Sequence, residues 1–415
     1  MLTTLSFRMV RVLTLSIALC ALVFVPSSAV AQDAAAAKQV MNPAKAPAGP
    51  ETIELKELWR VGGYDDEEVL FGVITDIITD ADGNFYMLDS QLSEVQVYSP
   101  DGEYLRTIGR EGEGPGEFRG AFNLLLLPSG DIGVLQTFPS KVIGLTPAGD
   151  PADDFLLPET EGDVGFKALF QARNAGDQLA VVFILTQPSE AGFTQKNVLS
   201  LFDADGENER RLHSQDSSLV VSDPVFAESV WDTFRARWTS GSDGKVYSAI
   251  DFGEYKITAW GSDGKISHVI NRDYAEHERT EEQSARILGI FQGFTRQIPI
   301  PNLRFDIEPK WNPVAALSAR EDGTLWVRTS RGNFGLPEDE AARYDVFDND
   351  GKLKRQLILK GQGNPEEDGY FIVGDKLFVV TDWLNSLMAL QGGGGTTEDM
   401  DEEAEPMEII CYQLP

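Results

Sequence analysis

The chain of 415 residues carries 35 Lys and Arg against 66 Asp and Glu, a formal net charge of −31. Such an excess of negative charge repels phosphate backbones, whereas nucleic-acid binders present clustered basic residues, so nucleic acid is not expected as a partner. The sequence holds only 2 cysteines, which argues against a fold held together by disulfides.

The first residues have the order of a secretory signal peptide. Arg8 and Arg11 precede an apolar run from Val12 to Val25, and Ala29-Val30-Ala31 offers small residues for cleavage. The run is shorter than the ~20 apolar residues that cross a bilayer, so cleavage is favoured over a membrane anchor, and no membrane span is expected afterwards. We therefore expect an exported protein, periplasmic or extracellular, whose mature chain begins near Gln32.

The stretch from Gln32 to Pro50 is rich in Ala, Pro and Lys and is predicted to be a disordered linker. Residues 51–415 then form one predicted domain. Removing residues 1–31 leaves Cys411 as its lone cysteine. Core burial rather than an internal disulfide must therefore stabilise this domain.

A repeated turn signal is the main feature of that domain. Six turns each precede an apolar strand pattern, at Asp82-Gly83, Ser129-Gly130, Gly176-Asp177, Asp243-Gly244, Asp322-Gly323 and Gly374-Asp375. Their glycines lie 47, 46, 68, 79 and 51 residues apart. A unit of this length is typical of one four-stranded β-propeller blade with insertions of varying length.

A second turn follows in most units, at Asp101-Gly102, Gly149-Asp150, Asp205-Gly206, Asp263-Gly264 and Asp350-Gly351. These residues favour the positive φ of tight hairpins, and the runs beside them alternate with the strand period. Each pair of turns brackets two predicted strands, for example Asn84 to Leu88 and Val95 to Tyr98. The four strands of a blade are named A to D here, from the central channel outward.

The last unit offers only three strands, at Tyr370 to Val373, Lys376 to Thr381 and Glu408 to Leu414. An unattached strand, Thr52 to Arg60, repeats the layout of Glu103 to Arg106 and is predicted to complete the last blade. Pairing the two ends closes the ring and removes exposed sheet edges. The sequence thus predicts an all-β fold, a six-bladed β-propeller of four-stranded antiparallel blades with one short helical insertion.

One stretch of the sequence resembles a known family. Val97-Tyr98-Ser99-Pro100-Asp101-Gly102, then Ile108-Gly109, Gly112, Gly114 and Gly116-Glu117-Phe118, is similar to the NHL repeat. The similarity extends from Trp59 to Asp150 and is weak afterwards. It resembles the NHL-type six-bladed propellers of exported bacterial proteins, which implies a fold and a binding scaffold but no reaction.

Long connections are predicted to gather on one face of the ring, because strands alternate in direction. The A-to-B and C-to-D turns are short, whereas the opposite face carries Thr186 to Asn197, Ser330 to Arg343, Trp383 to Met407, Arg211 to Asp232 and Asn271 to Pro313. Binding usually resides on such a long-loop face, although the same loops are also tolerated as insertions without a role. Thr280-Glu281-Glu282-Gln283 has the form of a capping box and predicts a helix over the channel mouth.

Aligning the A strands by their turns predicts a ligand site near the channel mouth. The alignment places Asp76, Asn123, Phe170, Arg237, Ala316 and Asp368 at one level, with Arg119, Lys167, Arg235 and Trp311 slightly earlier as a rim. Convergent polar groups at a mouth mark ligand sites, and this basic and aromatic rim suits an anionic or sugar-like ligand. The alternative is that these side chains form salt bridges and pack between blades.

Catalytic and metal-binding signals are weak. Asp76, Asn123 and Asp368 resemble the calcium ligands of lactonase-type propellers, but Arg237 at the same level opposes a second cation. Only 3 histidines occur, so a His-rich zinc site is not expected. No nucleophile elbow or phosphate loop is present in the sequence. No cofactor is therefore predicted. Calcium is expected only if the protein is a hydrolase of the lactonase type.

The preferred functional interpretation is an extracytoplasmic binding scaffold whose long-loop face and channel mouth engage a protein, peptide or glycan. One alternative is a calcium-dependent hydrolase of the lactonase or esterase kind, with no catalytic residue identified. Another is a structural component of an envelope assembly. A calcium response that depends on Asp76 would separate the hydrolase from both other interpretations.

Overall fold

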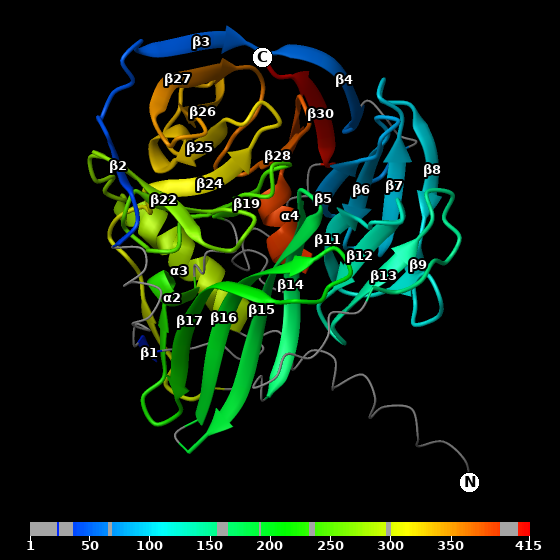
Figure 1. Cartoon of the computed structure of the whole chain (residues 1–415), viewed down its shortest axis with the longest axis horizontal. Helices are drawn as coiled ribbons and strands as arrows, with labels where there is room; N and C mark the ends of the chain where they lie inside the picture. Colours follow the sequence, from blue (N-terminus) through cyan, green and yellow to red (C-terminus); the bar gives the residue numbers. More distant parts are fainter. Residues whose placement is uncertain are drawn as a thin grey trace.

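The computed structural model describes residues 23–24, 36–64, 69–155, 165–190, 192–231, 237–295, 300–390 and 406–415. In these residues, six main sheets stand around a central axis as the blades of a propeller (Figure 1). The predicted fold class, an all-β six-bladed β-propeller, is confirmed.

Blade 1 shows the predicted pattern in full. It consists of β5 (Ile74–Thr79), β6 (Phe85–Asp89), β7 (Glu94–Tyr98) and β8 (Tyr104–Ile108), all antiparallel. In the first turn, Gly83 has a φ of 83°, a conformation that favours glycine. The Asp80 carboxylate accepts hydrogen bonds from the backbone N–H groups of Asp82 and Asn84, each at 2.9 Å. The Asp-x-Asp-Gly sequence here is thus a hairpin turn, as predicted.

Blades 2 and 3 differ in length. Blade 2 has β11 (Ala121–Leu126), β12 (Ile132–Gln136) and β13 (Lys141–Leu145), with single bridges from Pro151 and Phe155 along β13. Blade 3 has β14 (Phe166–Ala175), β15 (Gln178–Ser189), β16 (Gly192–Asp203) and β17 (Arg210–Val220). The predicted insertion from Thr186 to Asn197 is therefore an extension of the β15–β16 hairpin rather than a loop.

Blades 4 to 6 follow the same antiparallel order. Blade 4 has β19 (Trp238–Ser240), β20 (Val246–Ser248), β21 (Lys256–Trp260) and β22 (Ile266–Arg272). Blade 5 has β24 (Val314–Ala319), β25 (Leu325–Thr329), β26 (Glu340–Phe347) and β27 (Leu353–Lys360). Blade 6 has β28 (Gly369–Val373), β29 (Lys376–Val380) and β30 (Glu408–Gln413).

The segment before blade 1 pairs with one blade after another. β2 (Gln39–Asn42) lies parallel to β22 of blade 4, and β3 (Pro50–Glu54) lies parallel to β27 of blade 5. β4 (Lys56–Gly62) then pairs antiparallel with β30 and completes blade 6. We name β2 and β3 the outer belt. Figure 1 shows it in blue along the rim.

Two expectations are corrected by this path. The stretch predicted as a linker contains β2, because its backbone groups pair with the open edge of blade 4. The closing strand is Lys56–Gly62 rather than Thr52 to Arg60, since residues 52–54 belong to the neighbouring blade. The predicted signal peptide falls outside the described residues except for β1 (Val23–Phe24), which pairs with β17.

Asn42 fixes the belt between blades 4 and 5. Its buried side chain accepts a hydrogen bond from the backbone N–H of Leu353 at 2.8 Å and donates to the carbonyl of Gly351 at 2.9 Å. Arg272 adds a second connection by donating to the Ala44 carbonyl at 2.5 Å. The Arg272 guanidinium also forms a buried ion pair with Asp345 at 2.5 Å.

Apolar side chains fill the space between every two neighbouring blades. Six separate clusters occupy these interfaces, including one between blades 6 and 1. At that last interface Trp59 of β4 lies 6.0 Å from Phe85 of blade 1 and 5.7 Å from Phe378 of blade 6, between ring centroids. Cys411 is buried there as well, and burial raises the pKa of its thiol to about 12. The ring is thus closed by packing as well as by strand pairing.

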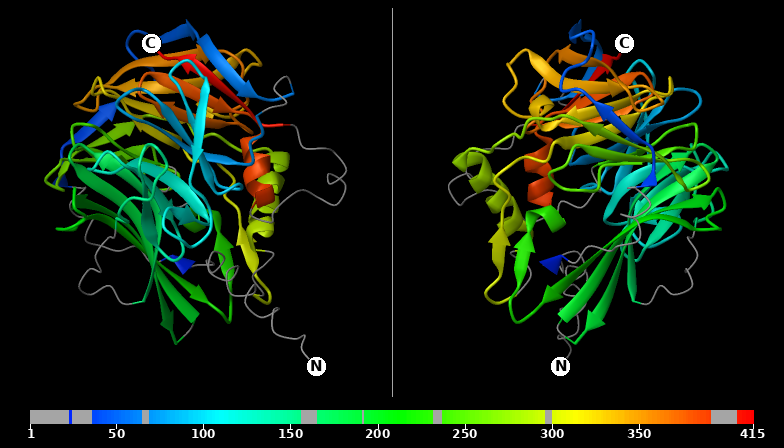
Figure 2. Two further views of the ribbon diagram at one scale, coloured as in Figure 1. Left: turned by 90° about the vertical axis from the view of Figure 1, so that its right-hand side faces the viewer. Right: turned by 60° about the vertical axis from the view of Figure 1, so that its left-hand side comes forward.

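The two faces of the ring are unequal, as predicted. The A-to-B and C-to-D turns form a short-turn face. The opposite, long-loop face carries α2 (Glu228–Trp231), α3 (Glu281–Thr295), α4 (Trp383–Leu390) and the 3-10 turn η2 (Ser330–Gly332), together with β18 (Val225–Ala227) and β23 (Arg304–Asp306). A small parallel pair, β9 (Arg110–Glu111) and β10 (Glu117–Phe118), follows blade 1. Figure 2 shows α3 and α4 standing off one side of the blades.

The helices differ from the single insertion that was predicted. The capping-box helix is present as α3, and α4 lies in a stretch that we expected to be a loop. No helix within the described residues is long and apolar enough to cross a membrane.

Candidate functional site

Two long insertions fold together on the long-loop face. β18, from the connection between blades 3 and 4, pairs in parallel with β23, from the connection between blades 4 and 5. Phe226, Val230 and Phe291 form the buried centre of an apolar cluster that also includes Ile287 and Phe305. These insertions therefore have a core of their own, outside the ring.

A buried ion pair joins the same two insertions. The Arg279 guanidinium donates to both carboxylate oxygens of Glu228, at 2.5 Å and 2.6 Å, and both side chains are almost inaccessible to solvent. Glu228 also accepts from the backbone N–H of Glu308 at 3.0 Å. The Arg279 guanidinium also donates to the Glu308 carbonyl at 2.8 Å, while its buried Nε atom has no partner among the described residues. The two-pronged contact with Glu228 fixes the geometry of the insertions.

Trp311 is part of this support rather than an open rim. Only 9% of its surface is exposed, and it is stacked on Phe334 with ring centroids 3.5 Å apart. Arg279 lies over the ring at 4.0 Å, and the indole N–H donates to Gln283 at 3.3 Å. Gln283 in turn accepts from the N–H of Thr280, while Thr280 accepts from the N–H of Gln283, so the predicted capping box is confirmed.

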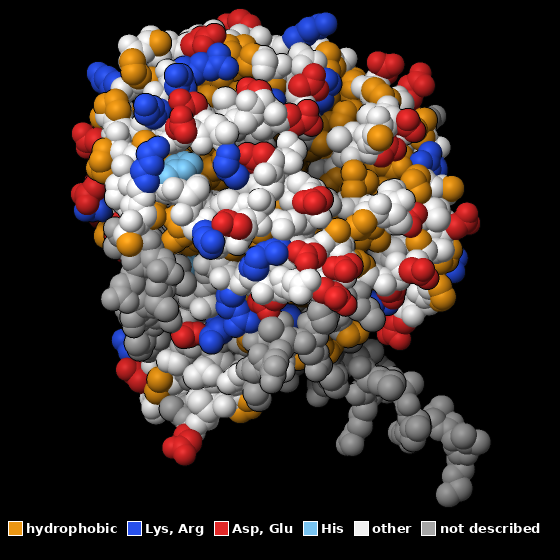
Figure 3. All heavy atoms as spheres, viewed as in Figure 1, with side chains coloured by type: hydrophobic (Ala, Val, Ile, Leu, Met, Phe, Trp, Pro, Cys, Tyr) orange, Lys and Arg blue, Asp and Glu red, His pale blue; other side chains and the backbone are white. Residues whose placement is uncertain are grey.

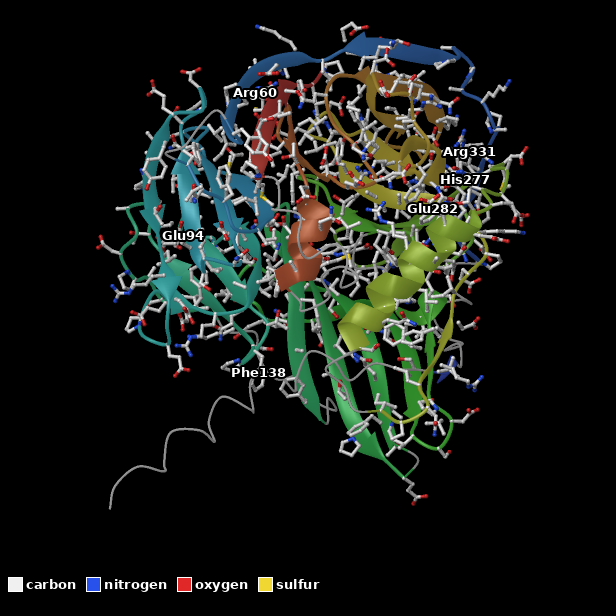
Figure 4. The ribbon with its side chains drawn as sticks, turned by 180° about the vertical axis from the view of Figure 1, so that it is seen from behind. Arg60, Glu94, Phe138, His277, Glu282 and Arg331 are labelled. Atoms are coloured by element: carbon white, nitrogen blue, oxygen red, sulfur yellow. The ribbon has the colours of Figure 1, made fainter. Side chains whose placement is uncertain are left out.

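The helix α4 lies beside α3 over the middle of the ring. Figure 4 shows both helices on this face, with His277, Glu282 and Arg331 near the first turn of α3. Burial and the charge of Arg331 lower the pKa of His277. Arg286 of α3 forms an ion pair at 3.8 Å with Glu367, which precedes blade 6.

The apolar side chains of α4 are only partly covered. Its sequence is Trp-Leu-Asn-Ser-Leu-Met-Ala-Leu, yet none of its residues is fully buried. Trp383 is anchored to the ring, since its indole N–H donates to the carbonyl of Ile74 at 2.6 Å. The helix is thus held at its first residue and presents apolar surface beyond it.

Asp76 and Asn123 connect the inner strands of blades 1 to 3. The Asp76 carboxylate accepts from the side chain of Asn123 at 2.6 Å and from the backbone N–H of Leu124 at 2.8 Å. Asn123 accepts from the N–H of Ala172 at 2.7 Å. Burial raises the pKa of Asp76, opposed by the charge of Arg173. We name these side-chain contacts from one inner strand to the next blade the inner stitches. Asp76 and Asn123 each satisfy a backbone donor on the open inner edge of that blade.

Gln171 continues the inner stitches and was missed. Its side chain accepts from the indole N–H of Trp238 in blade 4 at 2.7 Å. The sequence alignment put Phe170 at this level, but blade 3 has a two-residue turn, which shifts the strand by one position. For the same reason Gly369, and not Asp368, occupies the level in blade 6. The turn lengths are the signal that identifies both shifts.

Arg237 is buried, with 2% of its surface exposed, and donates to the Ala249 carbonyl at 3.0 Å. Arg119 forms ion pairs with Glu111 at 3.4 Å and Glu113 at 3.2 Å. Lys167 lies over the Phe183 ring at 4.3 Å. Arg235 falls outside the described residues. The described members of the predicted rim are therefore distributed among separate contacts.

Asp368 holds a turn on the long-loop side of blade 6. Its oxygens accept from the backbone N–H groups of Asn364 at 2.7 Å and Asp382 at 3.0 Å, and burial raises its pKa. The three residues of the calcium alternative are thus engaged in contacts within the protein. In the part of the chain that the structure describes, no group of three or more His, Cys, Asp and Glu side chains is arranged to hold a metal ion.

Several solved structures are similar to this one, with low sequence identity. A protein from Bacteroides fragilis described as a "putative exported protein" is 10% identical, with 88% of this chain and 99% of that chain covered and a TM-score of 0.45. A member of the DUF4221 family from Bacteroides vulgatus is 11% identical, with 87% and 98% covered and a TM-score of 0.47. A virginiamycin B lyase from Staphylococcus aureus is 10% identical, with 87% and 100% covered and a TM-score of 0.41. At this level the similarities carry no functional argument.

The sequence has no match among curated proteins. The family resemblance is confirmed only at the level of the propeller, and the NHL type stays a prediction. Residues 66–143 match the family DUF5128, which is described as a 6-bladed beta-propeller.

Proposed function

We propose that this protein is an exported binding scaffold whose long-loop face engages a protein, peptide or glycan partner. The main support for the proposal is the way in which the insertions of that face pack together. The two insertions have their own apolar core and a buried ion pair, and they hold α3 beside the partly covered helix α4. Rigid elements that present partly exposed apolar side chains are a common basis for partner binding.

Charge favours a partner segment that combines apolar and basic residues. The first turn of α3 carries Glu281 and Glu282, both exposed, and the whole chain has a net charge of −31. Exposed Arg286 and Arg331 lie on the same face, so the preference rests on the net charge, which attracts a cationic segment and repels an acidic one. Among the three partner classes, a protein or peptide therefore fits this face better than a neutral glycan.

Site-specific photocross-linking tests the proposal in the producing cells. A photoreactive residue at position 282 of α3 should give one defined adduct, and the same residue at position 263, in an exposed turn of the short-turn face, should give none. Leu387→Asp in α4 should abolish the adduct at position 282 while the unfolding temperature is retained. Equal adducts at both positions, or no adduct at position 282, would contradict the proposal.

Export is the second part of the proposal and is supported by the order of charges and apolar residues before Gln32. Mass spectrometry of the native protein should give a mature N terminus near that residue. A chain that retains Arg8 and Arg11 would contradict cleavage.

A further inference from the structure

A hollow of about 660 Å³ opens on the short-turn face, opposite the helices. It lies among the A-to-B turns of blades 3 to 6, with one residue from the C-to-D turn of blade 4. Its polar lining includes Asp177, Ser242, Asp243, Ser262, Arg320 and Glu321. Figure 3 looks onto this face, where acidic and basic side chains lie interspersed around the centre. A hollow of this volume is within the usual range of small-molecule sites.

The charged groups of the hollow are not paired with one another. Asp243 is engaged by Lys245 at 2.8 Å. Asp177 and Glu321 are exposed, and neither forms an ion pair or a side-chain hydrogen bond with any other described residue. Two carboxylates, from blades 3 and 5, thus remain open to a cationic group.

Arg320 has the opposite charge and is also incompletely satisfied. Its guanidinium lies over the Trp326 ring, 4.9 Å from the centroid, and forms no ion pair within the described residues. Its Nη1 atom is buried and has no hydrogen-bond acceptor. Nη1 is enclosed by the protein, but Nε and Nη2 are not, and neither donates to a described residue. A ligand oxygen in the hollow would therefore be stabilised by these two donors.

A ligand with a single charge fits this lining poorly. A simple anion would meet Arg320 but also Asp177 and Glu321, and a simple cation would leave the Arg320 donor unsatisfied. A molecule that carries both charges at separate ends satisfies all three groups. Free peptides and amino acids have this chemistry, with an ammonium group and a carboxylate.

We propose that the hollow binds a zwitterionic ligand, an amino acid or a short peptide with free termini. Arg320 holds the carboxylate, and Asp177 and Glu321 receive the ammonium group. Ser242 and Ser262 supply hydroxyl groups for the polar atoms between the two ends. This site lies on the face opposite the proposed partner surface and does not depend on it.

Calorimetric titration of the mature protein with the tripeptide Ala-Ala-Ala tests the proposal. Saturable binding is expected, and acetylation of the N terminus or amidation of the C terminus should each weaken it by about tenfold or more, the value of a lost charged hydrogen bond. Arg320→Gln should weaken the free peptide and make it bind like the amidated one. Asp177→Asn should likewise remove the difference between the free and acetylated forms.

Arg304→Gln is the matched control, because Arg304 is exposed and paired with Asp223 on the long-loop side. It should leave peptide binding unchanged. Asp177 lies in an exposed turn, so Asp177→Asn keeps the test valid if Arg320→Gln does not fold. The proposal is overturned if the tripeptide shows no saturable binding up to roughly 10 mM, beyond which a site of this kind is not selective. Equal binding of the blocked peptides, or unchanged binding to the folded variants, overturns it as well.

Discussion

The two halves of the ring are joined to their neighbours in different ways. Blades 1 to 3 are connected near the channel by the inner stitches, in which Asp76 and Asn123 satisfy backbone donors of the next blade. Between blades 4 and 5 one such contact is present, from the N–H of Ala319 to Thr239 at 3.3 Å. These two blades also receive parallel strands of the outer belt at their outermost edges, and blade 6 receives β4. Polar side chains at the inner edge and added strands at the outer edge thus solve the same problem, which is an unpaired strand edge.

Truncations of the N-terminal segment should have the largest effect on the stability of the fold. They distinguish the contribution of the outer belt from that of β4, which closes the ring. Deleting the mature chain through Glu54 removes only the belt and should leave a folded propeller of reduced stability. Deleting it through Gly62 also removes β4 and Trp59, which close the ring, and should abolish cooperative unfolding. Thermal unfolding followed by circular dichroism measures both. Two truncations of equal stability would contradict the distinction.

Asp76→Ala should have the next largest effect, a loss of about 2–6 kcal/mol in the free energy of unfolding. It leaves the Leu124 N–H and the Asn123 amide without their acceptor, and each unsatisfied buried donor costs about 1–3 kcal/mol. Urea unfolding measures the change. Asp101→Ala, in an exposed turn of the same blade, is the control and should be close to neutral. A neutral Asp76→Ala would show that the inner stitches do not stabilise the ring.

Asn42→Ala tests how much the outer belt contributes to the free energy of unfolding. The change removes the acceptor of the Leu353 N–H and should cost about 1–3 kcal/mol. In the chain truncated through Glu54 the residue is absent, so that truncation should cost at least as much as the substitution. A larger loss from Asn42→Ala than from the truncation would contradict this account of the belt.

The pH dependence of stability should carry a smaller contribution from Asp76. Because burial raises its folded-state pKa, the folded protein binds this proton more tightly than the unfolded chain does. The resulting stabilisation is complete below the unfolded pKa of about 3.9 and is lost as the pH rises through the raised folded pKa. The unfolding free energy of the wild type should therefore fall relative to that of Asp76→Asn as the pH rises through this window. A difference independent of pH would contradict a raised pKa.

Calcium should have the smallest effect. The carboxylates of Asp76 and Asp368 accept hydrogen bonds from the protein, so we expect calcium to leave the unfolding temperature unchanged at fixed ionic strength. A saturable increase that is lost in Asp76→Ala would favour the hydrolase alternative instead.

The sequence is sufficient to predict the ring because hairpin turns are local signals. The turn at Asp82-Gly83 and its equivalents place most strands within a few residues of their observed bounds. Which residue of an A strand occupies the equivalent position near the channel is harder to predict. That position changes by one residue whenever the following turn is shorter, as at Gly176. Side-chain pairing across blades depends on that register and is harder still to predict.

The belt and α4 could not be predicted for a different reason. Parallel pairing of β2 with β22 joins residues such as Val40 and Ile270, which are 230 positions apart, and nothing local in an Ala-rich and Pro-rich stretch indicates it. The apolar residues of α4 have no strand period, and a short helix on a surface lacks the buried face that would reveal it. Trp311 was placed on a rim because burial by Phe334 and Arg279 depends on tertiary packing.

The pairing of β4 with β30 has a consequence for the order of folding. Ile409 meets Val61 across the last blade, so the ring closes between segments almost at opposite ends of the domain. During synthesis β4 emerges before all six A strands, yet it has no antiparallel partner until residues 408–413 have been made. Contacts this distant in sequence form slowly. An incomplete chain therefore exposes the edges of its first and last available blades, and that interval is when the protein is most exposed to aggregation.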